Sequence, residues 1–115
     1  MSGGDDSRWD VCLPLETMAA RFVREHDAAR GPVPAWAQML NVVGEAGEAA
    51  EAYRRSTGHA RRSGSFEELG EELADVVMAT YILAQRLDLD LNQAIVDKHR
   101  KVMSRGFDHR EVNPT

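Results

Sequence analysis

Four acidic side chains form two pairs with the same spacing. Glu45 and Glu48 are three residues apart, and Glu72 and Asp75 repeat that interval. Residues three apart in a helix lie on one face, so each pair presents its carboxylates together. If the two helices lie side by side, the four carboxylates raise each other's pKa unless a cation lies between them. Mg²⁺ accepts such oxygen ligands, so the spacing indicates a magnesium site.

The simpler alternative is that these acids belong to solvated helix faces, as acidic pairs in helical proteins often do. Two observations favour a shared site. Asp75 lies within the most apolar segment of the chain, where an unpaired charge would be costly and where we expect it to be shielded. Glu45 and Glu48 are surrounded by glycine and alanine, so no long side chain covers them. From spacing alone, both interpretations stay open.

Two basic residues near the end of the chain extend this chemistry. Lys98 interrupts the inner apolar line of the last predicted helix, and Arg105 follows seven residues later on much the same side. Two inward-facing cations could neutralise the charge of a polyphosphate bound to the metal. The alternative for Lys98 is that its stem covers apolar surface while its ammonium group pairs with an acid.

The elements that must position these residues are all predicted to be helices. Apolar residues recur at helical spacing, and β-branched residues never form an alternating run. Gly31 and Pro32 stop the first helix, Ser65 and Glu68 form a capping box before the third, and Asp90 caps the fourth. The predicted ranges are 14–31, 34–55, 65–87 and 90–104.

These helices predict one all-α domain, a bundle of four to five helices over residues 13–107. Residues 1–12 and 108–115 are predicted to be tails, and the loop 56–64 carries Arg61 and Arg62. The segment 73–84 is apolar on almost every side, which a single small chain can hardly cover. We therefore expect a homodimer or homotetramer.

Composition excludes several classes of protein. The chain has 115 residues, a formal net charge of −5 and 43% hydrophobic residues, which suits one soluble domain and argues against a duplex nucleic acid as partner. Cys12 is the single cysteine, so a disulfide within the chain and a cysteine-based metal site are both excluded, and a reducing cytoplasm is expected. No apolar run approaches the length that spans a membrane.

The spaced carboxylates resemble those of the MazG-like nucleotide pyrophosphohydrolases. That family carries a Glu-Glu-x-x-Glu block, a Glu-x-x-Asp block, and later a Lys and an Arg on the last helix. The corresponding residues here are Gly44-Glu45-Ala46-Gly47-Glu48, Glu72-Leu73-Ala74-Asp75, Lys98 and Arg105. The likeness spans about residues 15 to 107, nearly the whole predicted domain.

The resemblance implies an all-α dimer or tetramer with Mg²⁺, or Mn²⁺ as its substitute. The catalytic and metal-binding residues it implies are Glu45, Glu48, Glu72 and Asp75, with Lys98 and Arg105 facing the phosphates. It implies hydrolysis of a (d)NTP at the α-phosphorus to the monophosphate and pyrophosphate, in nucleotide-pool house-cleaning. Metal coordination would lower the pKa of the attacking water, in keeping with that reaction.

The sequence departs from the family pattern at three positions. Gly44 replaces the first Glu of the block, as in the dCTP-pyrophosphatase branch. Ala79 stands where that branch has an aromatic residue, and Val102 stands where many members of the family have Asn. Trp36 and Tyr53 are the aromatic residues that could stack on a base, although packing is the commoner role of such side chains. Two alternatives stay open: a phosphoribosyl-ATP pyrophosphatase, and a helical interaction module without catalysis.

Overall fold

The computed structural model describes residues 14–59 and 64–106, and all regular structure in them is helical. The helices are α2 (Leu15–Arg30), α3 (Ala35–Ser56), α4 (Phe66–Arg86) and α5 (Leu91–Arg105). The all-α class is therefore confirmed. The predicted tails, Cys12, Arg61 and Arg62 lie outside the described residues. Among the helices described, none is both long and apolar enough to cross a membrane.

Local capping explains why the helix bounds follow the prediction closely. Ser65 accepts a hydrogen bond from the Glu68 amide, and Glu68 accepts one from the Ser65 amide, which completes the predicted capping box. Asp90 caps α5 by accepting from the amide of Gln93. Gly31 ends α2 at a φ of 88°, a backbone conformation that favours glycine.

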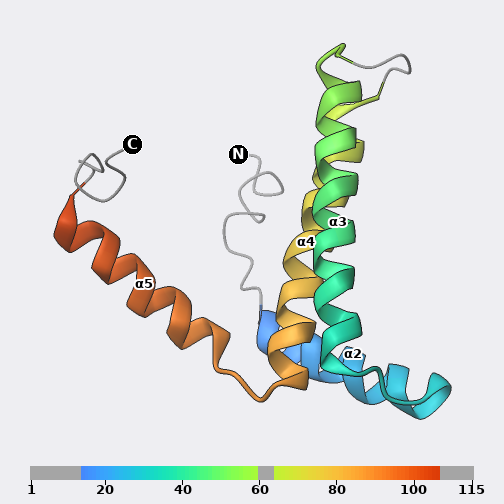
Figure 1. Cartoon of the computed structure of the whole chain (residues 1–115), viewed down its shortest axis with the longest axis vertical. Coiled ribbons are helices and arrows are strands. Elements are labelled where there is room, and N and C mark those ends of the chain that lie inside the picture. The colour runs from blue at the N-terminus through green and yellow to red at the C-terminus, as the bar shows by residue number, and fades with distance from the viewer. Residues whose placement is uncertain (1–13, 60–63, 107–115) are drawn as a thin grey trace, which may run out of the picture.

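Helices α3 and α4 lie side by side as a long hairpin, and α2 crosses its base (Figure 1). Ala19 of α2 packs with Tyr81 and Ile82 of α4 to form the core at this crossing. Gln38 is buried at the start of α3 and donates to the carbonyl oxygen of Ala79 at 3.1 Å. This contact fixes α3 against α4 near the crossing.

A second polar contact joins α2 to the end of α4. Both terminal guanidinium nitrogens of Arg86 donate to the carboxylate of Asp27, at 3.0 and 3.1 Å. The Arg86 side chain is only 6% exposed, so this ion pair is largely shielded from water. We call these two residues the α2–α4 clamp.

Helix α5 does not pack as a bundle helix, which corrects the prediction of four to five packed helices. It runs away from the hairpin, and none of its residues is buried (Figure 1). Its beginning is nevertheless fixed, because Leu91 packs against the core and Tyr81 donates to the side-chain oxygen of Asn92 at 2.7 Å. Three of the four described helices therefore form the packed body.

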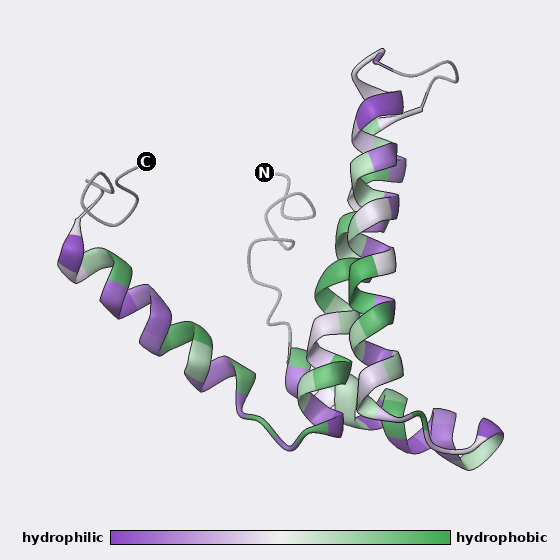
Figure 2. Cartoon of the chain, in the orientation of Figure 1, coloured by the Kyte–Doolittle hydropathy of each residue, from purple (hydrophilic) through white to green (hydrophobic). Residues whose placement is uncertain are grey.

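Apolar residues remain exposed along the hairpin, whose ribbon carries hydrophobic residues on both helices (Figure 2). They include Leu40 and Val43 of α3 and Leu73 and Val77 of α4. The core is correspondingly small, since alanines supply most of its fully shielded residues. Trp36 is 69% exposed and Tyr53 56%, so the expectation that these two rings are packed is wrong for the single chain.

Candidate metal centre

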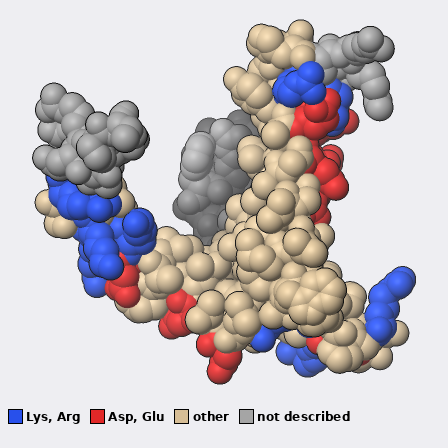
Figure 3. All heavy atoms as spheres, viewed as in Figure 1, with Lys and Arg blue, Asp and Glu red and all other residues tan. Residues whose placement is uncertain are grey.

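The α3–α4 hairpin brings the two predicted acidic blocks together. One carboxylate oxygen from each of Glu45, Glu72 and Asp75 lies within 4.8 Å of the others. Glu48, one turn after Glu45, is close enough to raise the pKa of both Glu45 and Glu72. We call these four residues the carboxylate cluster. Figure 3 shows acidic side chains along one edge of α3, whereas basic ones gather on α5.

The electrostatics of the cluster are those of crowded like charges. Removal from water raises the pKa of Glu45 above its ordinary 4.5, and the charges of Glu48, Asp75 and Glu72 add to the rise. Removal from water also raises the pKa of Glu72, with Glu48 and Asp75 contributing. Arg55 opposes this effect at Glu72 without reversing it. The residues described in ranges 14–59 and 64–106 therefore do not neutralise the cluster.

The donors present fit a hard divalent cation. All of them are carboxylate oxygens, the ligand type that Mg²⁺ and Mn²⁺ prefer. One oxygen of Glu72, Oε1, is buried and has no hydrogen-bond partner among the described residues. A buried oxygen without a partner is costly, and a bound cation would supply the missing partner.

Asp75 differs from its expected environment. Its apolar sequence neighbours led us to expect a shielded charge, but Asp75 is exposed, while Glu45 and Glu72 are partly buried. The reason is that α4 turns this position toward a hollow between the helices, not toward the core. Its proximity to Glu45 and Glu72, and not its burial, now supports Asp75 as a ligand.

The hollow next to the cluster has a volume of about 330 Å³ and is bounded by α2, α3 and α4. Glu45 and Asp75 line it together with a mainly apolar wall. The other lining residues are Phe22, Asn41, Met78, Ala79 and Ile82. The sequence prediction missed Phe22 and Asn41 as site residues. Asn41 precedes Glu45 by four residues and so shares its face of α3, which is the signal that could have identified it.

A family model described as the MazG-like family matches residues 43–112. The chain belongs to the MazG-like family. No curated protein and no solved structure matches the chain. The matched segment contains all four carboxylates, and the family points to a nucleotide pyrophosphohydrolase that uses a divalent metal ion.

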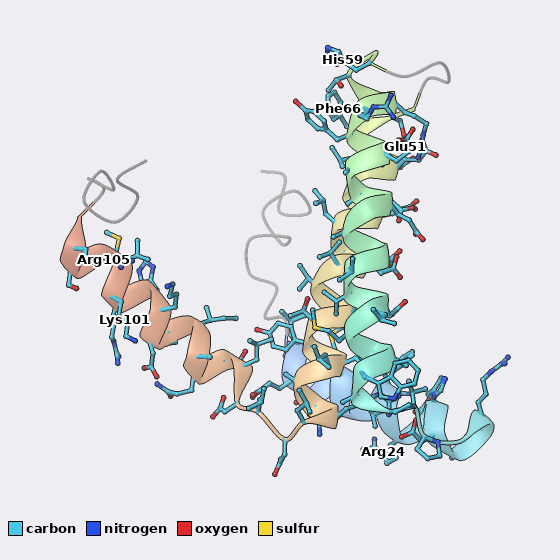
Figure 4. All side chains as sticks on the ribbon, viewed as in Figure 1. Arg24, Glu51, His59, Phe66, Lys101 and Arg105 are labelled. Atoms are coloured by element: carbon cyan, nitrogen blue, oxygen red, sulfur yellow. The ribbon has the colours of Figure 1, made fainter. Side chains whose placement is uncertain are left out.

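In this MazG-like chain, Lys98 and Arg105 are not brought to the carboxylate cluster. Both are exposed on α5, which leaves the packed body after its first turn; Arg105 and its neighbour Lys101 are labelled in Figure 4. Their predicted contact with phosphate stays a prediction, and so does the snorkelling alternative for Lys98. Trp36 and Tyr53 lie on α3 but do not line the hollow, so their base-stacking role also stays a prediction.

The glycines of the first block are not required by packing within the chain. A Cβ atom added at Gly44 or Gly47 would meet no described atom within 4 Å, apart from its chain neighbours and the adjoining backbone of its own helix. Each costs about 1 kcal/mol of helix stability relative to alanine. The space at Gly44 shows that steric exclusion does not explain why it replaces the first Glu of the family block.

Proposed function

We propose that this chain hydrolyses a nucleoside triphosphate to the monophosphate and pyrophosphate with Mg²⁺, or Mn²⁺ as a substitute. One observation carries the proposal: three carboxylate oxygens lie within 4.8 Å of one another. A buried oxygen of Glu72 without a partner in the described part of the chain adds to it. The family supports the reaction class. We further propose that the reaction acts on (d)NTPs and serves nucleotide-pool house-cleaning.

The residues that would hold the metal are Glu45, Glu48, Glu72 and Asp75. When bound, the ion would lower the pKa of a coordinated water and offset charge on the phosphate oxygens. A carboxylate of the cluster would accept the proton of the attacking water. Lys98 and Arg105 would offset the charge that remains on the polyphosphate.

We also propose that the chain works as a homodimer or homotetramer. The apolar side chains exposed on the hairpin and the unpacked α5 support this, because both leave apolar surface in water. Reciprocal contacts between two copies would cover both surfaces with one closed symmetry. Light scattering tests the assembly, and the mass of a single chain would contradict it.

A nucleotide panel tests the reaction. The full-length protein is incubated with Mg²⁺ and each common and modified (d)NTP, with phosphoribosyl-ATP included, and the monophosphate and pyrophosphate are quantified. Release of pyrophosphate from at least one (d)NTP, abolished by a chelator and restored by Mg²⁺ or Mn²⁺, is the expected result.

Two other outcomes separate the alternatives. Release from phosphoribosyl-ATP and from no (d)NTP would assign the chain to the phosphoribosyl-ATP reaction. Absence of turnover together with absence of Mg²⁺ binding in calorimetry would leave the interaction module as the better interpretation. The calorimetry is independent of turnover, so an unsuitable nucleotide panel does not hide a functional metal site.

A further inference from the structure

Arg55 is a basic residue that continues the acidic face of α3. It lies seven residues, or two turns, after Glu48, and Ala52 lies between them on the same face. Ala52 is 1% exposed, which identifies this face as the one that packs within the α3–α4 hairpin. Arg55 therefore lies in line with the carboxylate cluster, at the end of the hairpin where Glu51 and His59 are labelled in Figure 4.

The side chain of Arg55 lies near Glu72 of the cluster. Gly64 packs against its base, because the Gly64 amide donates to the Arg55 carbonyl oxygen at 3.1 Å and a Cβ atom at Gly64 would come within 2.8 Å of the Arg55 Cβ. Side chains in a helix lean toward its N-terminus, so the stem of Arg55 leans toward Glu48. The guanidinium is near enough to act against the rise in the pKa of Glu72, yet no oxygen of Glu72 lies within 4.0 Å of it.

The guanidinium of Arg55 has hydrogen-bond donors that no described residue uses. Arg55 is partly buried, and its side chain forms no hydrogen bond and no ion pair with another residue in the described part of the chain. Its neighbour Arg54 differs, because it donates to the Glu51 carboxylate at 2.6 Å and to the His59 carbonyl oxygen at 3.2 Å. A guanidinium presents five N–H donors in a planar fork that fits two oxygens of a phosphate group. Arg55 is therefore available to an anion, whereas Arg54 is already paired.

The two ends of the carboxylate cluster differ in charge. The hollow lies at the end nearer α2, and its charged lining residues are the acids Glu45 and Asp75. No Lys, Arg or His among the described residues lines the hollow, so phosphate groups are repelled there. Arg55 lies at the other end, about 15 Å beyond Glu45 along the axis of α3. A polyphosphate bound at the cluster therefore meets a favourable charge toward the end of the hairpin that carries Arg55.

We propose that Arg55 binds the two phosphates that leave as pyrophosphate. The inference rests on the proposed function and adds to it the direction of the substrate, whose β- and γ-phosphates extend along the hairpin toward Arg55. In the reaction, the water oxygen forms a bond to the α-phosphorus and gives its proton to a carboxylate of the cluster. The bond from the α-phosphorus to the bridging oxygen breaks, and that oxygen keeps the electron pair and leaves with pyrophosphate. A guanidinium beside the leaving group stabilises this charge as it develops.

Calorimetry with inorganic pyrophosphate tests this role without turnover. In saturating Mg²⁺, Arg55→Met should weaken pyrophosphate binding by at least about 10-fold, because hydrogen bonds to a charged group are lost while the stem is kept. Arg55→Lys keeps the charge but not the planar fork, so it should recover part of the affinity. Arg54→Met is the matched control, since Arg54 is exposed and paired with Glu51, and it should bind pyrophosphate as wild type does. Thermal midpoints check the folding of each variant, and Arg55→Gln replaces Arg55→Met if the latter is unfolded.

Titration with Mg²⁺ alone distinguishes phosphate binding from a purely structural role of Arg55. Loss of a positive charge near Glu72 should leave the Mg²⁺ affinity of Arg55→Met equal to that of wild type or higher. Unchanged pyrophosphate affinity in Arg55→Met would mean that Arg55 only offsets the charge of the acids, which overturns the inference. A weaker Mg²⁺ affinity would also overturn it, because the effect on pyrophosphate would then come from the metal site.

The nucleotide panel separates this inference from the proposed reaction. If wild type hydrolyses (d)NTPs but pyrophosphate binding is absent or is equal in Arg55→Met, the inference is overturned and the reaction stands. If wild type binds pyrophosphate through Arg55 but releases none from any nucleotide, the anion site is supported and the reaction is contradicted. If wild type neither binds pyrophosphate nor turns over nucleotides, both are overturned.

Discussion

The α2–α4 clamp and the carboxylate cluster are two polar groups at helix contacts, and they differ in the charges that they bring together. The clamp pairs opposite charges, whereas the cluster groups like charges. In the clamp, Arg86 donates twice to Asp27, and these bonds hold the pKa of Asp27 below its ordinary 3.8, with a further contribution from His26. In the cluster, like charges and removal from water raise the pKa of Glu45 and Glu72. In the clamp the opposite charges of Arg86 and Asp27 balance each other, whereas in the cluster the proposed metal ion would balance the charge.

This difference separates structure from function. The clamp pairs opposite charges within the chain, although Arg86 Nε is buried without a partner among the described residues, and we expect it to stabilise the crossing of α2 and α4 while Asp27 is ionised. We expect the like charges of the cluster to lower the stability of the metal-free protein, and the proposed metal ion to relieve their repulsion. We therefore expect substitutions in the clamp to lower the thermal midpoint, and substitutions in the cluster to weaken metal binding and turnover.

The largest effect is expected from removing a ligand charge in the cluster. Glu48→Gln and Asp75→Asn should each weaken Mg²⁺ binding and lower kcat/KM by more than about 100-fold, because amides bind a hard cation less well than carboxylates do. The thermal midpoint of the metal-free protein should not fall. Calorimetry, turnover and thermal unfolding measure the three quantities.

Glu51→Gln is the matched control for Glu48→Gln. Glu51 lies on the same helix but pairs with Arg54 at 2.6 Å and is not part of the cluster. Its substitution should leave Mg²⁺ affinity and turnover unchanged. An equal loss of Mg²⁺ affinity in Glu51→Gln and Glu48→Gln would mean that the overall negative charge of α3, and not the cluster, governs metal binding.

The next largest effect is expected from breaking the clamp. Arg86→Met leaves Asp27 without its partner at a largely shielded position, so the thermal midpoint should fall by several degrees. The Mg²⁺ affinity of the folded protein should be retained, because no clamp residue belongs to the cluster. Arg21→Met is the control: it breaks the exposed pair with Glu25 and should hardly change the midpoint. An unchanged thermal midpoint in Arg86→Met would contradict the expectation that the clamp stabilises the fold.

The cluster and the helix bounds were predictable from sequence because their signals are local. Ser65 with Glu68 and Asp90 with Gln93 act within one turn of helix. The carboxylates follow from a spacing of three residues on two helices joined as a hairpin. The family match was predicted from the same blocks.

The clamp and the course of α5 were not predictable because their signals are distant. Asp27 and Arg86 are 59 residues apart, and nothing in either neighbourhood indicates the pair. Helix α5 carries an apolar line that predicts packing, but the contact from Tyr81 to Asn92 fixes only its beginning. Phe22 belongs to an amphipathic stripe, and such a stripe looks the same whether a residue faces the core or a hollow.

The smallest effect expected is also the most direct test of the opposite charges, namely the pH dependence of stability without metal. Glu45 and Glu72 have folded pKa values above 4.5, so their contribution to stability is present below that pH and is lost as pH rises through the raised values. Asp27 has a folded pKa below 3.8, so its contribution is present above that pH and is lost as pH falls through the lowered value.

Thermal unfolding in chelator between about pH 4 and pH 8 should therefore show Glu45→Gln with a flatter profile than wild type and a slightly higher midpoint near neutrality. Added Mg²⁺ should reverse that order, because only the intact cluster gains stability from the ion. A Glu45→Gln midpoint below that of wild type in chelator at neutral pH would contradict mutual repulsion, since it would mean that the Glu45 charge stabilises the metal-free fold.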